Sequence, residues 1–414
     1  MSSGRFIELL TPAELHLIET VRDVSSAFAA NVPMHDHEAT VAFEHLDALR
    51  RCGYLAAAVP AEHGGSGASL LAIVLAQAAL AESDPSTALG VGMHLMVTGG
   101  ESWVPSWEPD RRRAMYAGVV AGRIFLNVLA TEPEMGSPQG GTRPATLLTP
   151  VGAGRWLLSG RKTFATFAHA LTHALVFASV EDGSGDVAMA IVPMDTDGIT
   201  IECTWDTIGM RGTASHDVYF SEVPLSDGDL LTRRPAAFTA TRPAMSPWFV
   251  LTVAASYLGI ARAARDEAVS FARQRRPGGG PAISTVPYVR DQIARMDLHL
   301  FACESILVMA ALSAGQDLVR APRVRPIEPL EAAAKLEVGD RACEVVDLAM
   351  RVMGGAGLQR MGRLERLYRD VRSATVHPPI EARALDILAR SALDDPTYQT
   401  GMMGSALLRP ASVS

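Results

Sequence analysis

The sequence predicts an α+β protein of three consecutive domains, the first helical, the second built of β-strands and the third helical. Three observations predict this order. Apolar residues recur at helical spacing in residues 1–121, short β-type runs follow in residues 122–234, and helical spacing returns in residues 235–414. With 414 residues, 48% of them hydrophobic, the chain is long enough for two to three packed domains.

Helix caps mark the N-terminal domain. Thr11-Pro12-Ala13-Glu14 is a capping box with proline at the first helical position, which is a specific start signal. Asp84 before Pro85 marks another helix start. Further helices are expected at residues 38–52, 69–82, 86–98 and 110–117. This domain is therefore predicted to be entirely helical.

The spacing of apolar residues changes at Gly122, where glycine, proline, aspartate and serine begin to separate short β runs. These runs cover residues 123–130, 145–150, 156–162, 174–179, 186–192 and 218–220. Helices are then expected at residues 246–274, 288–313 and 328–353, near 364–370, and at 381–391. We therefore expect a small all-β middle domain and a helical C-terminal domain.

An irregular crossing is predicted between the last two helices, at Val376-His377-Pro378-Pro379. Proline lacks a backbone N–H and drives the preceding residue out of helical conformation, so two adjacent prolines exclude a helix here. His377 is therefore expected on a rigid turn, a placement that suits a side chain aimed into a pocket.

Charge and cysteine usage exclude several classes of function. The net charge of −8 argues against a nucleic-acid partner, whose phosphates call for a basic face. Four well-separated cysteines are typical of reduced thiols in a cytoplasmic protein, and no secretory segment is expected at the N-terminus. The apolar run 248–261 is too short to span a bilayer, so no membrane is expected. His35-Asp36-His37 and the His169/His173 pair lack a further ligand at useful spacing, so no metal site is predicted.

Six stretches, taken in order, resemble the acyl-CoA dehydrogenase superfamily. Residues 130–137 contain the family's TEPxxGS pattern and residues 160–166 its GxKxxxT strand. The other four are the loop at 53–65, the loop at 209–213, the GGxG turn at 353–357 and Tyr368-Arg369-Asp370. The resemblance implies an N-terminal α-helical domain, a middle β-barrel domain and a C-terminal four-helix bundle, with a flavin between barrel and bundle.

The resemblance also implies which residues hold the flavin. Threonine hydroxyls suit the polar edge of its ring system, an aromatic face suits its flat surface, and glycines admit a phosphate close to the backbone. The implied cofactor-binding residues are Thr131, Ser137, Phe164, Thr166, Arg275, Arg351, Gly354 and Gly355. The family further implies a homotetramer or homodimer in which the GGxG turn meets the flavin of the neighbouring subunit.

The catalytic carboxylate of the dehydrogenases is missing from both places where the family puts it. A dehydrogenase needs a base to remove the proton next to the thioester. The usual position, nine residues after Arg369, holds Pro378, and the alternative position, nine residues before Leu258-Gly259, holds Phe249. Glu381 is the nearest carboxylate, and it is expected to start the last helix.

His377-Pro378 instead resembles the crossing of the two-component flavin-dependent monooxygenases of this superfamily, such as dibenzothiophene monooxygenase, 4-hydroxyphenylacetate hydroxylases and amino-sugar N-oxygenases. That branch takes reduced flavin from a separate reductase, and hydrogen-bonding side chains hold its C4a-(hydro)peroxyflavin. The matching catalytic candidates are His377, Asn127, Thr166 and His94. For His94, a helix histidine satisfied by its neighbours is a nearly equal interpretation.

We therefore predict a monooxygenase that uses reduced FAD or FMN and O2 to hydroxylate a small molecule. FMN stays open because the loop 275–283 and Pro287 lack the aromatic and amide groups that usually grip FAD. The alternative is an atypical acyl-CoA or acyl-carrier-protein dehydrogenase that forms an α,β-unsaturated thioester with bound FAD, with Glu381 as the residue to test. A third class is a flavin-binding assembly partner without turnover.

Overall fold

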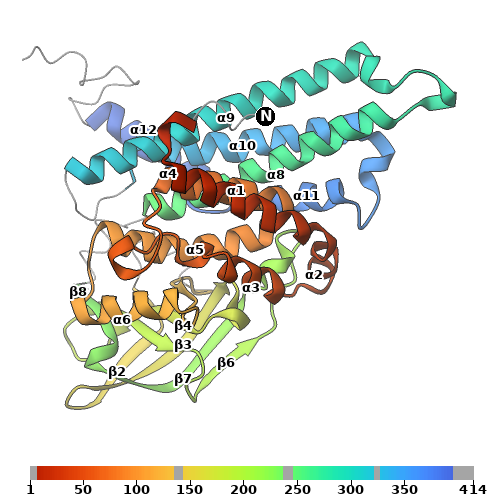
Figure 1. Cartoon of the computed structure of the whole chain (residues 1–414). Coiled ribbons are helices and arrows are strands. Elements are labelled where there is room, and N and C mark those ends of the chain that lie inside the picture. The colour runs from red at the N-terminus through yellow and green to blue at the C-terminus, as the bar shows by residue number, and fades with distance from the viewer. Residues whose placement is uncertain (1–6, 135–142, 236–245, 321–326, 395–414) are drawn as a thin grey trace, which may run out of the picture.

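The structure is a computed structural model that describes residues 7–134, 143–235, 246–320 and 327–394. Figure 1 shows the long C-terminal helices in one layer, the β-strands at the opposite end of the molecule, and α4 and α5 between them. The predicted order of a helical, a β and a second helical part is confirmed. The boundaries at 121/122 and 234/235 stay predictions.

The N-terminal part contains the capping box as predicted, with Glu14 and Thr11 each bonding the backbone N–H of the other. Its helices are α1 (Pro12–Ser26), α2 (Val32–Glu38), α3 (Phe43–Arg51), α4 (Leu70–Ser83), α5 (Pro85–Trp103) and α6 (Pro109–Val120). The prediction of one helix over 38–52 was wrong. Ala39 is left-handed with φ of 53°, and His35 bonds Thr40 and Glu44 across the break.

Helix α5 is also longer than predicted, because Gly99 does not end it. The ring of Trp248 lies so close to Gly99 that an added Cβ would stand 2.5 Å from it. Trp248 belongs to α8. Gly99 therefore lies inside α5, where it allows α5 and α8 to pack closely, and it does not end the helix.

The middle part is one eight-stranded sheet with the strand order β6-β7-β3-β2-β4-β5-β8, and β1 pairs with β4 in parallel. Its strands are β1 (Leu126–Leu129), β2 (Leu147–Gly152), β3 (Arg155–Ala165), β4 (His173–Val180), β5 (Asp186–Pro193), β6 (Ile199–Glu202), β7 (His216–Ser226) and β8 (Leu230–Pro235). The runs that were predicted became β1–β5 and β7, whereas β6 and β8 were not predicted. The central, long strand β3 carries the residues that face the candidate site.

The C-terminal part is a helical bundle around α8. Its helices are α8 (Pro247–Gln274), α9 (Pro287–Arg320), α10 (Pro329–Met353), α11 (Arg363–Val371) and α12 (Glu381–Asp394). Helix α8 packs against α10, α9, α4 and α5, so it joins the bundle to the N-terminal part. Most of its first half is fully buried, including Trp248 and Tyr257.

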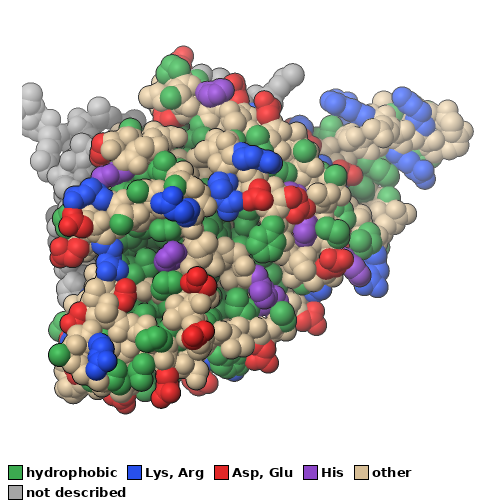
Figure 2. All heavy atoms as spheres, turned by 60° about the horizontal axis from the view of Figure 1, so that its bottom comes forward, with side chains coloured by type: hydrophobic (Ala, Val, Ile, Leu, Met, Phe, Trp, Pro, Cys, Tyr) green, Lys and Arg blue, Asp and Glu red, His purple; other side chains and the backbone are tan. Residues whose placement is uncertain are grey.

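Two helices are long and apolar enough to cross a membrane by length and composition, which corrects the estimate from the run 248–261. They are α8, in which 89% of the apolar window is buried inside the protein, and residues 287–316, in which 44% is buried. Burial of this extent identifies α8 as a core helix. Figure 2 shows basic and acidic side chains interspersed on one face, without a continuous basic surface there.

Candidate functional site

The crossing between α11 and α12 is non-helical, as predicted. A short 3-10 turn, Arg372–Thr375, follows α11, and the chain then runs irregularly to Glu381. The backbone N–H of His377 donates to the carbonyl of Ser373 at 3.2 Å. The Pro378–Pro379 peptide bond is cis.

His377 forms a hydrogen bond with a tyrosine from the centre of the bundle. The hydroxyl of Tyr257, on α8, bonds Nδ1 of His377, and the ring centroids are 5.9 Å apart. Tyr257 is fully buried, whereas His377 keeps partial exposure. Burial, followed by the positive charge of Lys335, lowers the pKa of His377 to about 4, so its imidazole is neutral at pH 7.

Lys335 supports the crossing from α10. Its buried ammonium donates to the carbonyl of Ala374 at 2.8 Å, three residues before His377. Burial lowers the pKa of Lys335 to about 8. The crossing is thus fixed from two sides, by Tyr257 on α8 and by Lys335 on α10.

A second set of polar side chains lies on the sheet and includes two of the predicted catalytic residues. Asn127, on β1, donates from Nδ2 to the carbonyl of Thr166 at 3.2 Å. The hydroxyl of Thr166 accepts from Ser215 at 3.1 Å, and Ser215 contacts Thr213 at 2.8 Å. The structure therefore brings Asn127 and Thr166 together and adds two hydroxyls that the sequence had not indicated.

The loop 209–213 connects the hydroxyl cluster to the helix before the crossing. The carbonyl of Met210 accepts from Thr213 at 2.8 Å, and its N–H donates to Asp370 on α11 at 2.6 Å. Gly209 touches α11 so closely that a Cβ would stand 2.3 Å from the carbonyl oxygen of Arg369. A glycine is therefore required here, and the sheet is held directly against the segment that leads to His377.

Phe164 occupies an unusual backbone conformation on this side of the sheet. Its φ is 55° and its side chain is 59% exposed, with the ring edge-on to Trp205 at 5.9 Å. A left-handed aromatic residue costs of order 1–3 kcal/mol. The ring of Phe164 is thus an exposed, flat apolar surface on the sheet.

Thr131 lies beside this surface, because its carbonyl accepts from the N–H of Thr163 at 3.0 Å. The next residue is structural. Glu132 is 1% exposed and bonds Lys162 at 2.6 Å and two backbone N–H groups. Ser137 lies outside the described residues. The intact TEP motif therefore serves in part as an ion pair that fixes the strand edge.

His94, the other histidine among the catalytic candidates, does not join these groups, and its backbone contacts favour the alternative of a helix histidine satisfied by its neighbours. It is fully buried on α5 and stacks on Phe125. Nε2 contacts the carbonyl of Leu55 at 2.9 Å, and Nδ1 accepts from the N–H of Leu126 at 3.2 Å. Both ring nitrogens are thus occupied by backbone, so His94 ties α5 to β1 and to the loop after α3.

The other predicted flavin-binding residues lie on the bundle. Arg275 follows the last turn of α8, and Gly354 and Gly355 follow α10, at the end of the bundle that lies to the right in Figure 1. All three are exposed, as is Arg351, and a Cβ on either glycine would meet no atom within 4 Å. Gly354 has a φ of 55°. Gly354 and Gly355 thus form an exposed turn at the end of α10, which we call the open cradle, whereas Phe164 lies on β3 of the sheet.

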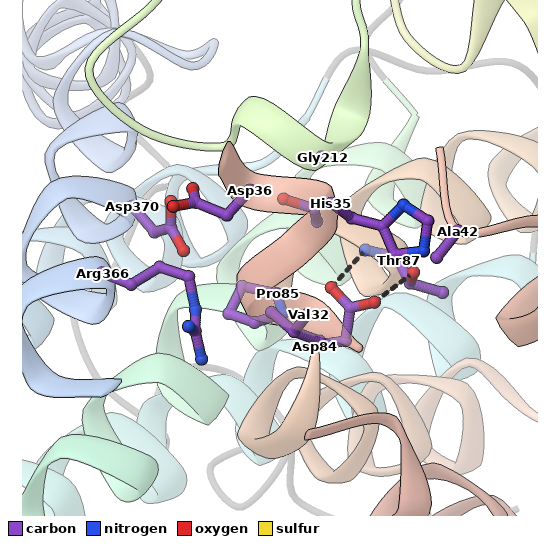
Figure 3. A pocket seen from close by; sticks show the side chains of 11 residues that line it. Val32, His35, Asp36, Ala42, Asp84, Pro85, Thr87, Gly212, Arg366 and Asp370 are labelled. Carbon is purple, nitrogen blue, oxygen red and sulfur yellow. Dashed lines mark hydrogen bonds between the residues drawn. The ribbon is translucent and has the colours of Figure 1, made fainter. Parts of the chain in front are cut away.

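Figure 3 shows a small pocket where α11 meets the N-terminal helices, with the carboxylates of Asp36 and Asp370 directed toward each other. Arg369 donates to both oxygens of Asp36, at 3.1 and 2.6 Å. Burial and the charge of Asp36 raise the pKa of Asp370 to about 7, against the lowering effect of the Met210 N–H. The pocket is small and lies between α11 and the N-terminal helices, so we assign it to the junction that positions α11.

The two positions compared with the dehydrogenase base lie in the crossing and in α8, and both hold a residue without a carboxylate. Pro378 follows His377 in the crossing, and Phe249 lies in the first turn of α8. Glu381 is exposed in the first turn of α12, where its charge acts on Asp340 of α10. No group of three or more metal-ligating side chains occurs within the described part of the chain.

A helical part, a sheet and a helical bundle in this order are the architecture of a family of flavin-dependent oxidoreductases. The chain belongs to the acyl-CoA dehydrogenase family. The family's N-terminal domain matches residues 11–102, its middle domain residues 127–223 and its C-terminal domain residues 250–393.

Two relatives and one solved structure show how the family divides around this chain. It is 36% identical over 379 residues to YdbM of Bacillus subtilis (strain 168), provisionally named as an acyl-CoA dehydrogenase, covering 91% of this chain and 96% of YdbM. It is 33% identical to the L-evernosamine nitrososynthase of Micromonospora sp., covering 93% and 91%. TdsC from Paenibacillus sp. A11-2, solved with FMN and indole, is 25% identical with a TM-score of 0.82, covering 92% and 97%.

The sequence had not indicated Tyr257, Ser215 or Lys335. Tyr257 lies in an apolar run and has the pattern of a core residue, and Lys335 lies on a helix where a lysine is usually solvated. The one available signal was that Tyr257 directly precedes the Leu258-Gly259 pair used to locate the alternative base.

Proposed function

We propose that this protein is a two-component flavin-dependent monooxygenase that oxygenates a small molecule at nitrogen or carbon. The observation that carries the proposal is the neutral, partly exposed imidazole of His377 beside Pro378, where the dehydrogenases hold a carboxylate. A neutral imidazole can donate one hydrogen bond and accept another at the same time, which an ionised carboxylate cannot do, and this suits hydrogen bonding to an oxygen species.

The residues of the sheet and of the bundle end fit a flavin. Phe164 offers an exposed aromatic face, Thr131 and Thr166 offer groups to a polar edge, and the open cradle at Gly354 and Gly355 suits a phosphate. A bound reduced flavin supplies two electrons to O2, so that one oxygen atom enters the substrate and the other leaves as water. Two likenesses support this chemistry: TdsC is a dibenzothiophene monooxygenase and was solved with FMN, and another relative is an L-evernosamine nitrososynthase.

The protein's own groups have separate tasks in this proposal. His377 holds a proton on its ring at the reacting side and donates a hydrogen bond there. Asn127 is bonded to the carbonyl of Thr166, which fixes this strand end beside the ring system. The neutral state of His377 matters, since a protonated imidazole would quench the developing negative charge on oxygen too early.

A second copy of the chain is part of the proposal. Arg275, Gly354 and Gly355 lie at the end of the bundle, and the crossing and the sheet are held by other elements. The cradle would then complete the flavin site of a neighbouring subunit in a homodimer or homotetramer. Light scattering on the purified protein tests this, and a monomer that binds flavin with full affinity would contradict it.

Cofactor supply and location belong to the same proposal. The loop after α8 has no aromatic or amide side chain to grip an adenine, which favours FMN or a loosely held FAD delivered by a flavin reductase. A cytoplasmic location is supported by the four cysteines, all of which are free thiols.

The decisive experiment mixes the anaerobic protein with reduced FMN or FAD, adds O2 and follows flavin reoxidation by stopped-flow absorbance. We expect the protein to delay reoxidation through a transient that free flavin lacks, and His377→Asn to shorten that transient. Reoxidation at the rate of free flavin, in the wild type as in the variant, would contradict the proposal.

The 36% identity to YdbM favours a dehydrogenase as the second candidate. In that case an acyl-CoA, added without oxygen, would bleach protein-bound oxidised FAD, and Glu381→Gln would abolish the bleaching. The exposed position of Glu381 in the first turn of α12 speaks against this function.

A further inference from the structure

We propose that Tyr257 is the positioning residue for His377: its buried hydroxyl donates to Nδ1, fixes the imidazole with its proton on Nε2, and so presents Nε2–H to the bound molecule. The proposal rests on the proposed function of His377 but makes a structural claim that is tested without flavin. It concerns a residue outside both of the family's carboxylate positions.

The direction of the hydrogen bond follows from counting protons. A neutral imidazole carries one N–H, and a tyrosine hydroxyl carries one proton that must find an acceptor when buried. Tyr257 is fully buried in α8, and Nδ1 of His377 is the acceptor that the described residues offer it. If His377 donated instead, the hydroxyl proton of Tyr257 would be buried without a partner. A buried hydroxyl without a partner costs about 1–3 kcal/mol, so we assign the tyrosine as the donor.

The surroundings keep both groups in the required protonation state. Burial, with added effects from the charges of Asp370 and Cys343, raises the pKa of Tyr257 well above its ordinary value, so its hydroxyl stays a donor. On the other side, Lys335 of α10 disfavours a second positive charge on His377. The described groups that act on the Tyr257–His377 pair therefore all favour a neutral donor and a neutral ring.

The exposed side of the pair is the histidine. His377 keeps partial exposure while Tyr257 has none, so a molecule approaching the crossing meets the imidazole. With Nδ1 occupied, Nε2 is the nitrogen left for that molecule. This arrangement orients a single N–H donor without charge, in the way a second group orients a catalytic imidazole in other enzymes.

The test uses the full-length protein labelled with 15N-histidine, without flavin. The His377 signal is assigned by its loss in His377→Asn, and its tautomer is obtained from the nitrogen chemical shifts at pH 7. We expect a proton on Nε2 in the wild type. In Tyr257→Phe we expect a mixture of tautomers and a higher pKa for His377, since the donor that stabilises the neutral ring is gone.

Tyr54→Phe is the matched control. Tyr54 is also fully buried, and its hydroxyl donates to Gln77 at 2.9 Å, so the variant loses a buried hydroxyl away from His377. It should leave the His377 signal unchanged. With reduced FMN and O2, Tyr257→Phe should release hydrogen peroxide about tenfold faster than the wild type or Tyr54→Phe, the size expected for one lost hydrogen bond.

A proton on Nδ1 in the wild type, or an unchanged tautomer in Tyr257→Phe, would overturn the proposal. The wild-type spectrum decides alone if Tyr257→Phe does not fold. If the tautomer is as expected but reduced flavin reoxidises as it does free in solution, the positioning claim stands and the proposed function fails. The two failures are therefore distinguishable.

Discussion

Two histidines of this protein share a protonation state and differ in what their nitrogens do. Burial lowers the pKa of both His94 and His377 to about 4, so both are neutral at pH 7. His94 is held at Nε2 and Nδ1 by the backbone of Leu55 and Leu126. His377 is held at Nδ1 alone, by a side chain, and is partly exposed. A neutral buried imidazole therefore does not identify a site, whereas a nitrogen left for a ligand does.

The largest expected effect is on activity, and it distinguishes His377 from His94. His377→Asn should lower oxygenation turnover by about 10²–10⁴-fold, the usual contribution of a positioned proton donor or acceptor. Its stability should change little, because the amide oxygen of asparagine can accept the hydrogen bond that the buried hydroxyl of Tyr257 donates to His377. Turnover with reduced flavin and O2, together with thermal unfolding, measures both.

His37→Asn is the control for this variant, since His37 is exposed at the end of α2. It should match the wild type in both measurements. Equal turnover in His377→Asn and His37→Asn would show that His377 has no catalytic role.

The next effect is on the free energy of unfolding, which should depend on His94 more than on His377. His94→Phe keeps the stacking on Phe125 but leaves the carbonyl of Leu55 and the N–H of Leu126 buried without their partner. We expect the free energy of unfolding to fall by about 2–6 kcal/mol, at 1–3 kcal/mol for each of the two groups. Reactivity per folded molecule should be unchanged. Denaturant unfolding and stopped-flow measurements on the same sample check this, and lost reactivity with intact stability would reverse the assignment.

The same variant gives a pH signature. As pH falls below 6.5, an unfolded histidine takes up a proton while His94 in the folded protein stays neutral down to about 4. The unfolded state then binds more protons, so the free energy of unfolding falls with pH through this window, by about 3 kcal/mol for one such histidine. Between pH 6.5 and about 4, the free energy of unfolding of His94→Phe should therefore depend less steeply on pH than that of the wild type.

The sequence predicted those parts of the molecule that depend on local signals. Capping residues located α1 and α5, and the proline pair located the crossing with His377. The motif around Phe164 and Thr166 predicted a site on the sheet, and the structure brings Thr166 next to Asn127 there, while the site itself stays a prediction. These features depend on backbone chemistry that neighbouring residues determine.

Features decided by distant contacts could not be predicted. The partners of His94 come from residues 39 and 32 positions away in the chain, and the partner of Tyr257 is 120 positions away. The four-residue strand β6 is defined by pairing with β7 rather than by its own pattern. Which histidine keeps a nitrogen for a ligand is therefore a property of the tertiary structure.

A smaller effect tests the sheet side of the site. Phe164→Ala should weaken flavin binding about three- to tenfold, because an aromatic contact contributes about 0.5–1.5 kcal/mol beyond its buried area. Titration with FMN and FAD measures the dissociation constants. Phe43→Ala is the matched control, since Phe43 is 51% exposed on α3, close in exposure to the 59% of Phe164. Equal affinities of the two variants would show that Phe164 does not face the flavin.

The last variant, Glu381→Gln, is expected to leave oxygenation unchanged, and this result separates the two candidate functions. Glu381 is exposed in the first turn of α12, where a carboxylate stabilises the helix dipole by about 0.3–1 kcal/mol. Glu381→Gln should therefore leave turnover with reduced flavin and O2 unchanged and lower stability only slightly. A dehydrogenase that used Glu381 as its base would lose its activity in this variant, while His377→Asn would spare part of it. The two variants measured side by side, with acyl-CoA and with reduced flavin, show whether the reacting proton passes through the imidazole of the crossing or through the carboxylate after it.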